Sequence, residues 1–363
     1  MKNILHITPN FNYSCGRSKL AFLYLKYFGG IDNYKTHFIT NGGDALSRLN
    51  EIPNLHFERF DFSTGFRNLI YKSYLYRSLK QYVLNNEIGL IHTHHRFAEF
   101  IATKIGTELN IKTITSAHSF VKGFERTSFK SHKIISVSKS LSNYLVIKYC
   151  VNKEKLITLY NPIEQPTQID SETTDRFKLE NSFSPDNKVL LFVGRIGKDK
   201  GYDTLISSLA YVTRKNKNVI LVINGHTKEK VFSHKSTSNN DNIVFIPPQK
   251  DNNYLYLLAD IVVLPSRVDP FPFVMIEAGS YKKPFIGGNT GGIAEFIEDG
   301  INGLLVDPEN PQVLAEKIIY LLNNPQIGRT MGEKLYEKVN RLCDYNNYFN
   351  EVEKIYNSLL NRE

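Results

Sequence analysis

The segment from Ala259 to Glu298 constrains the fold more than any other part of the sequence. Residues Ile261 to Leu264 are apolar and mostly β-branched, and Pro265 follows them. Such a short, uninterrupted apolar run is typical of a strand buried in a parallel sheet. A polar loop comes next, and the apolar spacing of residues 273–278 predicts a helix that begins near Pro272. A strand, a loop and a helix in this order indicate an α/β protein.

The predicted helix start lies where an open α/β sheet binds its ligands, at the carboxyl edge of the strands. The free N–H groups and the dipole of a helix N-terminus favour an anion there. Two acidic residues, Asp269 and Glu277, occur on either side of this point. Carboxylates only accept hydrogen bonds, so we expect them to bind sugar hydroxyls beside the anion. The alternative is one solvated acid and one acid on a helix face, with no ligand.

Strand-like and helix-like segments alternate along the rest of the chain, which predicts parallel sheets. In the first part, three predicted strands end in polar residues that would meet at one sheet edge: His92, His94 and His95, then His118, then Ser138. We do not expect a metal at the first group. Neighbouring residues of a strand point to opposite faces, and no acidic or cysteine ligand is near in sequence. His118 is a candidate for contacting a ligand at this edge. The alternative is that it is an ordinary histidine at the end of a strand, without a ligand.

The length and composition favour a cytoplasmic protein of two domains. A chain of 363 residues is too long for one ordinary core. The three cysteines are far apart and show no metal-binding spacing, which suits the reducing cytoplasm. The first ten residues are too polar for a signal peptide, and no run reaches the eighteen or so apolar residues that a membrane-spanning helix needs.

Positive charge is concentrated in the first part of the chain. Residues 1–162 hold 22 of the 45 Lys and Arg but 10 of the 36 Asp and Glu, a balance of +12, whereas the remainder has a balance of −3. This asymmetry indicates an anionic partner, either a membrane surface or a nucleic acid. The helix predicted over residues 69–84 carries basic residues and tyrosines beside an apolar face, as interfacial helices do, although core packing explains the pattern as well. No nucleic-acid motif accompanies the charge, so we favour the membrane.

A glycine-rich basic loop separates two predicted elements of the second half, the strand 189–193 and the helix 203–212. It contains Gly194, Arg195, Lys200 and Gly201. Backbone dipoles and side-chain cations together favour phosphate, although the ending of a P-loop is missing.

The basic loop and the segment from Pro265 to Glu295 together resemble the signature of the family 4 (group 1) retaining glycosyltransferases. In that family the V-G-R, spacer, K-G motif binds the nucleotide diphosphate, which implies this role for Arg195 and Lys200. The first acid contacts the donor sugar and the second binds the ribose, roles that fall on Asp269 and Glu277. Two departures are that the first acid is usually Glu, and that Pro272 replaces a frequent Gly and cannot donate a hydrogen bond.

The resemblance also implies positions for the remaining candidate residues. His118 would contact the donor sugar or the acceptor and count, with Arg195, Lys200 and Asp269, among the catalytic residues. The donor would also be contacted by Gly16, Gly194, Gly225, Phe273, Val274 and Glu277. No cofactor and no metal are expected, since the sequence has no Asp-x-Asp motif to hold an ion.

The fold implied is GT-B, with two Rossmann-like α/β domains facing each other across a cleft. We expect an acceptor-binding domain over residues 1–165, a nucleotide-sugar-binding domain over 185–343, a linker within residues 156–188, and a C-terminal helix over 344–363 that packs back on the first domain.

The activity implied is the transfer of a sugar from a nucleotide sugar, with UDP preferred, to a saccharide or lipid-linked saccharide acceptor, with retention of anomeric configuration. Such an enzyme would serve bacterial cell-surface polysaccharide synthesis, in the cytoplasm or at the inner face of the membrane. The alternatives are a nucleotide-sugar epimerase or a glycogen-synthase-like polymerase on the same fold, and a catalytically silent binding subunit of a glycosylation complex.

Overall fold

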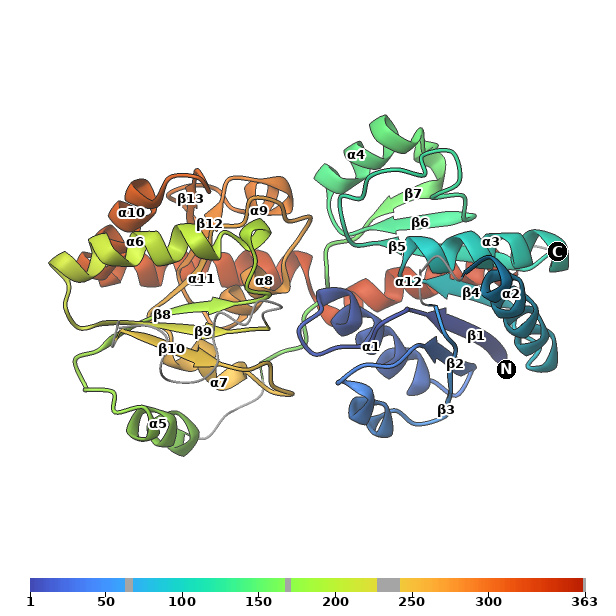
Figure 1. The fold of residues 1–363 in the computed structure, drawn as a ribbon, viewed down its shortest axis with the longest axis horizontal. Helices are drawn as coiled ribbons and strands as arrows, with labels where there is room; N and C mark the ends of the chain where they lie inside the picture. Colours follow the sequence, from blue (N-terminus) through green and yellow to red (C-terminus); the bar gives the residue numbers. More distant parts are fainter. Residues whose placement is uncertain (63–67, 167–170, 227–241, 362–363) are drawn as a thin grey trace. The chain divides into compact units, whose positions relative to one another are not determined.

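The computed structural model describes residues 1–62, 68–166, 171–226 and 242–361, and the chain forms two compact units. The first unit comprises residues 1–161 and 346–363, and the second comprises residues 162–345. Each unit contains one sheet whose strands all run parallel, with helices packed against it (Figure 1). The alternation of strands and helices predicted from the sequence is therefore confirmed.

The sheet of the first unit has seven strands in the order β3-β2-β1-β4-β5-β6-β7. These are β1 (Lys2–Ile7), β2 (Tyr34–Thr40), β3 (Leu55–Arg59), β4 (Leu90–Thr93), β5 (Lys112–Ala117), β6 (Lys133–Ser136) and β7 (Leu156–Thr158). The helices are α1 (Gly16–Gly29), α2 (Asn68–Asn85), α3 (Arg96–Leu109), α4 (Lys139–Tyr149) and α12 (Tyr345–Leu360). Helix α1 begins at Gly16, so the first strand-to-helix loop is short.

The two faces of this sheet pack against different helices, as the alternation of side chains along a strand requires. Leu5 and Ile7 of β1 point to the face covered by α2 and α3, where they join an apolar core. His6, between them, points to the opposite face, where its ring lies 5.5 Å from that of Tyr24 in α1 and 6.4 Å from that of Tyr356 in α12. The core on one face is therefore mainly aliphatic, and the opposite face of β1 is lined by aromatic and imidazole rings.

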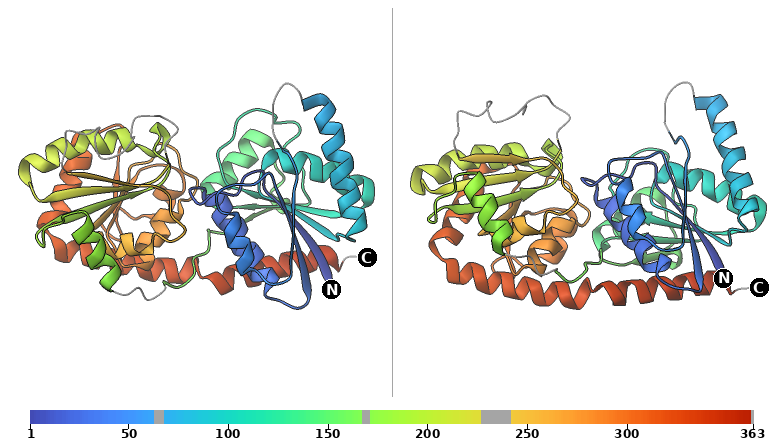
Figure 2. Two further views of the ribbon diagram at one scale, coloured as in Figure 1. Left: turned by 60° about the horizontal axis from the view of Figure 1, so that its bottom comes forward. Right: turned by 90° about the horizontal axis from the view of Figure 1, so that it is seen from below.

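The C-terminal helix α12 packs along the first unit, on the same face as α1 (Figure 2). The Tyr24 and Tyr348 hydroxyls lie 2.8 Å apart, and the Tyr34 hydroxyl donates to Glu353 at 3.1 Å. Phe349 is fully buried and stacks on Tyr27. Buried aromatic rings, anchored by hydroxyl hydrogen bonds, thus hold the end of the chain on the unit where the chain begins.

The sheet of the second unit has six strands in the order β10-β9-β8-β11-β12-β13. These are β8 (Lys188–Val193), β9 (Val219–Asn224), β10 (Ile243–Ile246), β11 (Ile261–Leu264), β12 (Phe285–Gly288) and β13 (Leu304–Val306). The helices are α5 (Ser171–Glu180), α6 (Tyr202–Lys215), α7 (Asn253–Leu258), α8 (Phe273–Ser280), α9 (Gly291–Phe296), α10 (Pro311–Asn323) and α11 (Pro325–Leu342). The strand at residues 261–264 and the helix start near Pro272 lie where the sequence predicts them.

The expectation of a linker over residues 156–188 is wrong for much of that segment. Residues 156–158 form the edge strand β7, and residues 171–180 form α5, which packs against α7 of the second unit. The Phe177 ring lies 5.5 Å from that of Tyr254. Polar composition concealed α5, because a helix anchored by one or two aromatic residues needs little other apolar surface.

Among the described residues, no helix combines the length and the apolar character required to span a membrane.

Candidate functional site

The glycine-rich basic loop between β8 and α6 has a shape that depends on its glycines. Gly201 has a φ of +69°, and a Cβ on it would lie 1.9 Å from the carbonyl oxygen of Pro265, at the end of β11. A Cβ on Gly225, after β9, would lie 1.9 Å from the carbonyl oxygen of Gly194, whose φ is +148°. These contacts bring the ends of β8, β9 and β11 close together, and no larger residue fits at either point.

Lys200 and Asp269 meet at this edge of the sheet, although 69 positions separate them in the sequence. The Lys200 ammonium donates a hydrogen bond to Oδ2 of Asp269. The Asp269 side chain is 4% exposed and the Lys200 side chain is 23% exposed. Two candidate residues of opposite charge therefore form one partly buried ion pair, which holds both side chains in position.

The backbone around Asp269 is also fixed. The amide of Gly292, in the first turn of α9, donates to the Asp269 carbonyl oxygen at 3.0 Å. A Cβ on Gly292 would lie 1.9 Å from the carbonyl oxygen of Pro270, so this turn is packed directly against α9. The Gly-Gly sequence at residues 291–292 therefore supports the loop of residues 265–272, which contains Asp269 and is called the acidic loop below.

Arg195 lies at the exposed side of the basic loop. Its side chain is 56% exposed, and its Nη2 donates to Oδ2 of Asp199 at 2.5 Å. An exposed pair of this kind contributes little to stability and can exchange partners readily. The guanidinium is therefore available to an anionic ligand at small cost to the fold.

Arg267, which the sequence reasoning did not select, connects the basic loop to the acidic loop. Its guanidinium donates to both carboxylate oxygens of Asp203, at 2.6 and 3.0 Å, and to Glu309 at 2.5 Å. Its backbone amide donates to the carbonyl oxygen of Asp199 at 2.9 Å. The hydrogen bonds that Arg267 donates to Glu309 and Asp203 raise its pKa. Although partial burial opposes the change, Arg267 lowers the pKa of Asp203.

Glu277 lies inside α8 with 6% of its surface exposed. The hydroxyl of Tyr256, in α7, donates a hydrogen bond to Oε2 of Glu277. Burial, and then the charge of this carboxylate, raise the pKa of Tyr256 well above its ordinary value. Helix α8 begins at Phe273, and no side chain caps its N-terminus at Pro272. The amides of Phe273 and Val274 therefore lie in a first turn that has no side-chain cap.

In the first unit, Gly16 opens α1 and His118 directly follows β5. Burial, and then the charge of Arg17, lower the pKa of His118 to about 3, so the ring is neutral near pH 7. Its Nε2 is buried and has no hydrogen-bond partner in the described part of the chain. The sequence placed His118 at a strand end, and the structure adds Arg17 as its charged neighbour.

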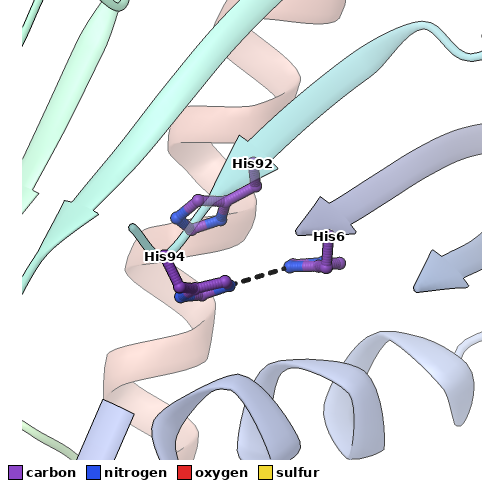
Figure 3. Close-up of side chains that lie close together, drawn as sticks. All are labelled: His6, His92 and His94. Carbon is purple, nitrogen blue, oxygen red and sulfur yellow. Dashed lines mark hydrogen bonds between the residues drawn. The ribbon is translucent and has the colours of Figure 1, made fainter. Parts of the chain in front are cut away.

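Three buried histidines, His6, His92 and His94, lie together beneath this edge (Figure 3). The expectation that neighbouring strand histidines point to opposite faces is wrong for His92 and His94, because residues two apart share a face. His6 comes from β1, the strand beside β4, and its Nδ1 lies 3.2 Å from Nε2 of His94. Burial lowers the pKa of His6 to about 3 and is the main cause of the low pKa values of the other two.

The geometry of the three histidines fits mutual hydrogen bonding better than metal coordination. Both nitrogens of His92 are engaged, one by the Tyr356 hydroxyl and one by Ser116 Oγ at 2.8 Å. If His6 Nδ1 and His94 Nε2 both bound an ion, their other nitrogens would carry protons. Those nitrogens have no acceptor in the described structure, whereas metal-bound histidines almost always have one. We therefore do not assign a metal site here.

Comparison with known proteins identifies the family. The fold matches the Anabaena protein Alr3699/HepE, solved in complex with UDP-glucose, with a TM-score of 0.84 and 17% identity over 99% of this chain and 100% of that one. The model of Glycosyltransferase Family 4 matches residues 31–165, and the model of Glycosyl transferases group 1 matches residues 173–338. The chain is a group 1 glycosyltransferase with the GT-B fold.

Two curated relatives of this group 1 glycosyltransferase match over most of their length. The capsular polysaccharide biosynthesis glycosyltransferase CapM of Staphylococcus aureus is 26% identical over 99% of this chain and 98% of its own. The N-acetyl-alpha-D-glucosaminyl L-malate synthase of Bacillus anthracis is 24% identical over 90% of each chain. The group 1 match includes the basic loop, the acidic loop and Arg267.

Proposed function

We propose that this glycosyltransferase moves a hexosyl or N-acetylhexosaminyl group from a UDP-sugar to a saccharide or lipid-linked saccharide, with retention of anomeric configuration. The observation that carries the proposal is the contact between Lys200 and Asp269. The Lys200 ammonium can bind a diphosphate, and the Asp269 carboxylate can accept hydrogen bonds from sugar hydroxyls. One hydrogen bond joins these two groups. In a nucleotide sugar the diphosphate and the sugar are bonded directly to each other, so one ligand can contact both side chains.

The relatives support the class of donor and the biological setting. The solved complex of Alr3699/HepE contains UDP-glucose, and CapM is named for capsular polysaccharide biosynthesis. We propose a UDP-sugar donor and a role in bacterial cell-surface polysaccharide synthesis on that basis.

The chemical step we propose breaks the bond between C1 of the donor sugar and the diphosphate oxygen. The electron pair leaves with the diphosphate, which gains charge, while C1 becomes oxocarbenium-like. Arg195 and Lys200 would neutralise the leaving diphosphate, as would the uncapped first turn of α8 through the amides of Phe273 and Val274. Gly194 and Gly225 would allow the nucleotide to approach the backbone closely, and Glu277 would accept from the ribose hydroxyls.

Retention requires the acceptor to attack the face of the sugar that the diphosphate leaves. We propose that a β-phosphate oxygen of the departing diphosphate takes the proton of the acceptor hydroxyl, so that no covalent intermediate with the protein forms. His118 would contact the donor sugar or the acceptor as a neutral hydrogen-bonding group, and Gly16 would contact the donor through its backbone. The reaction as proposed needs no cofactor and no metal ion.

A catalytically silent binding subunit is the competing proposal. The observation that favours it is that Lys200 and Asp269 neutralise each other, with Asp one methylene shorter than the usual Glu. Incubating the purified protein with UDP-glucose and UDP-N-acetylglucosamine, with detection of UDP release and of ligand-induced thermal stabilisation, distinguishes the two. An enzyme binds at least one UDP-sugar and releases UDP slowly in the absence of an acceptor. If the protein neither binds nor hydrolyses either UDP-sugar, the proposal of an enzyme is wrong.

The proposed partner of the first unit is an anionic membrane surface, contacted by the loop after β5. Its residues Lys122, Arg126 and Lys130 are exposed, as is the aromatic ring of Phe124, which is 74% exposed. A large exposed apolar ring among cations is typical of interfacial segments. The loop therefore carries this proposal, and the enzyme would work at the inner face of the cell membrane.

Helix α2 contributes less to that surface than its sequence suggested. The hydroxyl of Tyr82 lies 2.8 Å from His37 in the core, and Lys80 pairs with Glu108 at 2.5 Å. The side chains of residues 69–72 lie outside the described part of the structure. Tyr82 and Lys80 are therefore engaged in protein contacts, whereas Tyr74 and Arg77 remain exposed.

We expect the protein to bind vesicles that contain anionic lipid at low salt and to dissociate at high salt, because exposed charges are screened beyond about 10 Å at 0.1 M salt. Phe124→Ala together with Lys122→Ala should weaken the binding about tenfold or more. Cosedimentation with vesicles of phosphatidylglycerol and phosphatidylcholine measures both effects. Binding that is insensitive to salt, or unchanged in the double variant, would contradict the proposed surface.

A further inference from the structure

Arg17, in the first turn of α1, is a cation that has no counterion among the described residues. No hydrogen bond or ion pair joins its guanidinium to any of them, and its Nε is buried without a partner. No acidic residue lies in the first turn of α1, and the N-cap residue Cys15 makes no side-chain capping bond. The positive charge of Arg17 therefore adds to that of an uncapped helix N-terminus.

Three histidines share the carboxyl edge of the sheet with Arg17, because they follow the neighbouring strands β4 and β5. After burial, the charge of Arg17 lowers the pKa values of His95 and His118, and it also contributes to that of His94, after burial and the neighbouring histidines. The His94 and His118 rings lie 5.7 Å apart. His94 is 1% exposed, and its Nδ1 lacks a partner in the described structure, as does Nε2 of His118. The group thus contains a cation and neutral hydrogen-bonding rings, and no carboxylate contributes to the pKa changes of these histidines.

The topology of the sheet explains why these residues meet. The chain places β2 and β3 on one side of β1 and then returns to place β4 on the other side. The loops after β1 and β4 therefore lead to helices on opposite faces, α1 and α3, and leave the carboxyl edge open between them. Ligands bind at such a switch point in open α/β sheets. Arg17 follows β1, His94 and His95 follow β4, and His118 follows β5, the next strand in the sheet.

We propose that Arg17 and His118, beside the N-terminus of α1, bind an anionic group, phosphate or carboxylate, of the acceptor substrate. The inference rests on the proposed function, because it identifies the bound anion as part of the acceptor. An arginine and a helix N-terminus together match the charge and the oxygen geometry of such a group. The unpartnered ring nitrogen of His118 gains a hydrogen-bond partner, and the charge of Arg17 is neutralised. The acceptor is then a sugar phosphate, a phospholipid-linked saccharide or a small hydroxy acid.

The donor diphosphate is the other anion that could reach Arg17, and titrations without turnover distinguish the two. Calorimetry of the full chain with sn-glycerol 3-phosphate, L-malate, glycerol and UDP should show binding of at least one anionic probe, with a Kd on the order of 1 mM, and none of glycerol. Arg17→Ala should weaken that binding about 10- to 100-fold, as expected for the loss of charge-assisted hydrogen bonds. UDP affinity should remain within about twofold of the wild-type value.

The control variants separate charge from folding. Arg17→Lys keeps the charge and should retain part of the affinity, and Arg59→Ala removes an exposed arginine of the same unit and should change nothing. The melting temperature reports whether Arg17→Ala folds. Three results would overturn the inference: neither anion binds the wild type, the anion binds Arg17→Ala equally well, or UDP affinity falls as far as anion affinity. None of these results depends on sugar transfer, so failure of the proposed reaction remains separately detectable.

Discussion

Replacing Lys200 with alanine is expected to lower kcat for sugar transfer about 10²- to 10³-fold, as the loss of one donor to a developing anion does in other enzymes. The ammonium would stabilise the leaving diphosphate most strongly when that group carries its full charge. The same change leaves Asp269, with a side chain only 4% exposed, without its partner. We therefore expect a second effect, a loss of about 1–3 kcal/mol in the free energy of unfolding.

Lys200→Ala with Asp269→Asn separates the two effects. Because asparagine carries no buried charge, the double variant should regain most of the stability and none of the activity. Lys215→Ala, at the other end of α6 and exposed, is the matched control and should leave both properties unchanged. Steady-state kinetics and urea unfolding measure them. Full activity in Lys200→Ala would remove Lys200 from the proposed mechanism.

Replacing Arg195 with alanine should lower kcat by a similar factor, about 10²- to 10³-fold, but with little loss of stability. The difference follows from exposure, because Arg195 is 56% exposed and its pair with Asp199 contributes little to folding. Lysine is an imperfect substitute at this position, since it cannot present two parallel N–H groups to a phosphate. Arg195→Lys should therefore fall between the wild type and Arg195→Ala.

Arg214→Ala, at the exposed end of α6, is the control for the loss of one surface arginine. Kinetics with a UDP-sugar and thermal melting give the two measurements. If Arg195→Ala destabilises the protein as much as Lys200→Ala and keeps its turnover, the residue is structural and our assignment is wrong.

The sequence predicted the elements that depend on local pattern. The strand at Ile261–Leu264 and the helix start at Phe273 could be predicted because apolar runs and Pro272 act over a few residues. The meeting of Lys200 and Asp269 could only be expected from the family resemblance. Parallel strands bring distant loops to one edge, and no local pattern encodes which side chains pair there.

The residues that were missed are those whose role comes from long-range packing. Arg267 follows Ser266 in an unremarkable loop, yet it binds Asp203 and Glu309, 64 and 42 positions away. The contact of Tyr256 with Glu277 joins α7 to α8, which are separated in the chain by the strand β11. The group of His6, His92 and His94 could not be predicted either. His6 is the only histidine of the first strand, and its contact with His94 follows from the pairing of β1 with β4.

The central claim is that Arg195 and Lys200 bind the pyrophosphate of the donor, and the affinities for UDP and UMP test it most directly. Calorimetry should give a wild-type Kd for UMP about 10²-fold higher than for UDP, because only UDP carries the β-phosphate. In Arg195→Ala with Lys200→Ala the two Kd values should approach each other. An unchanged ratio of the two Kd values in this double variant would contradict the account.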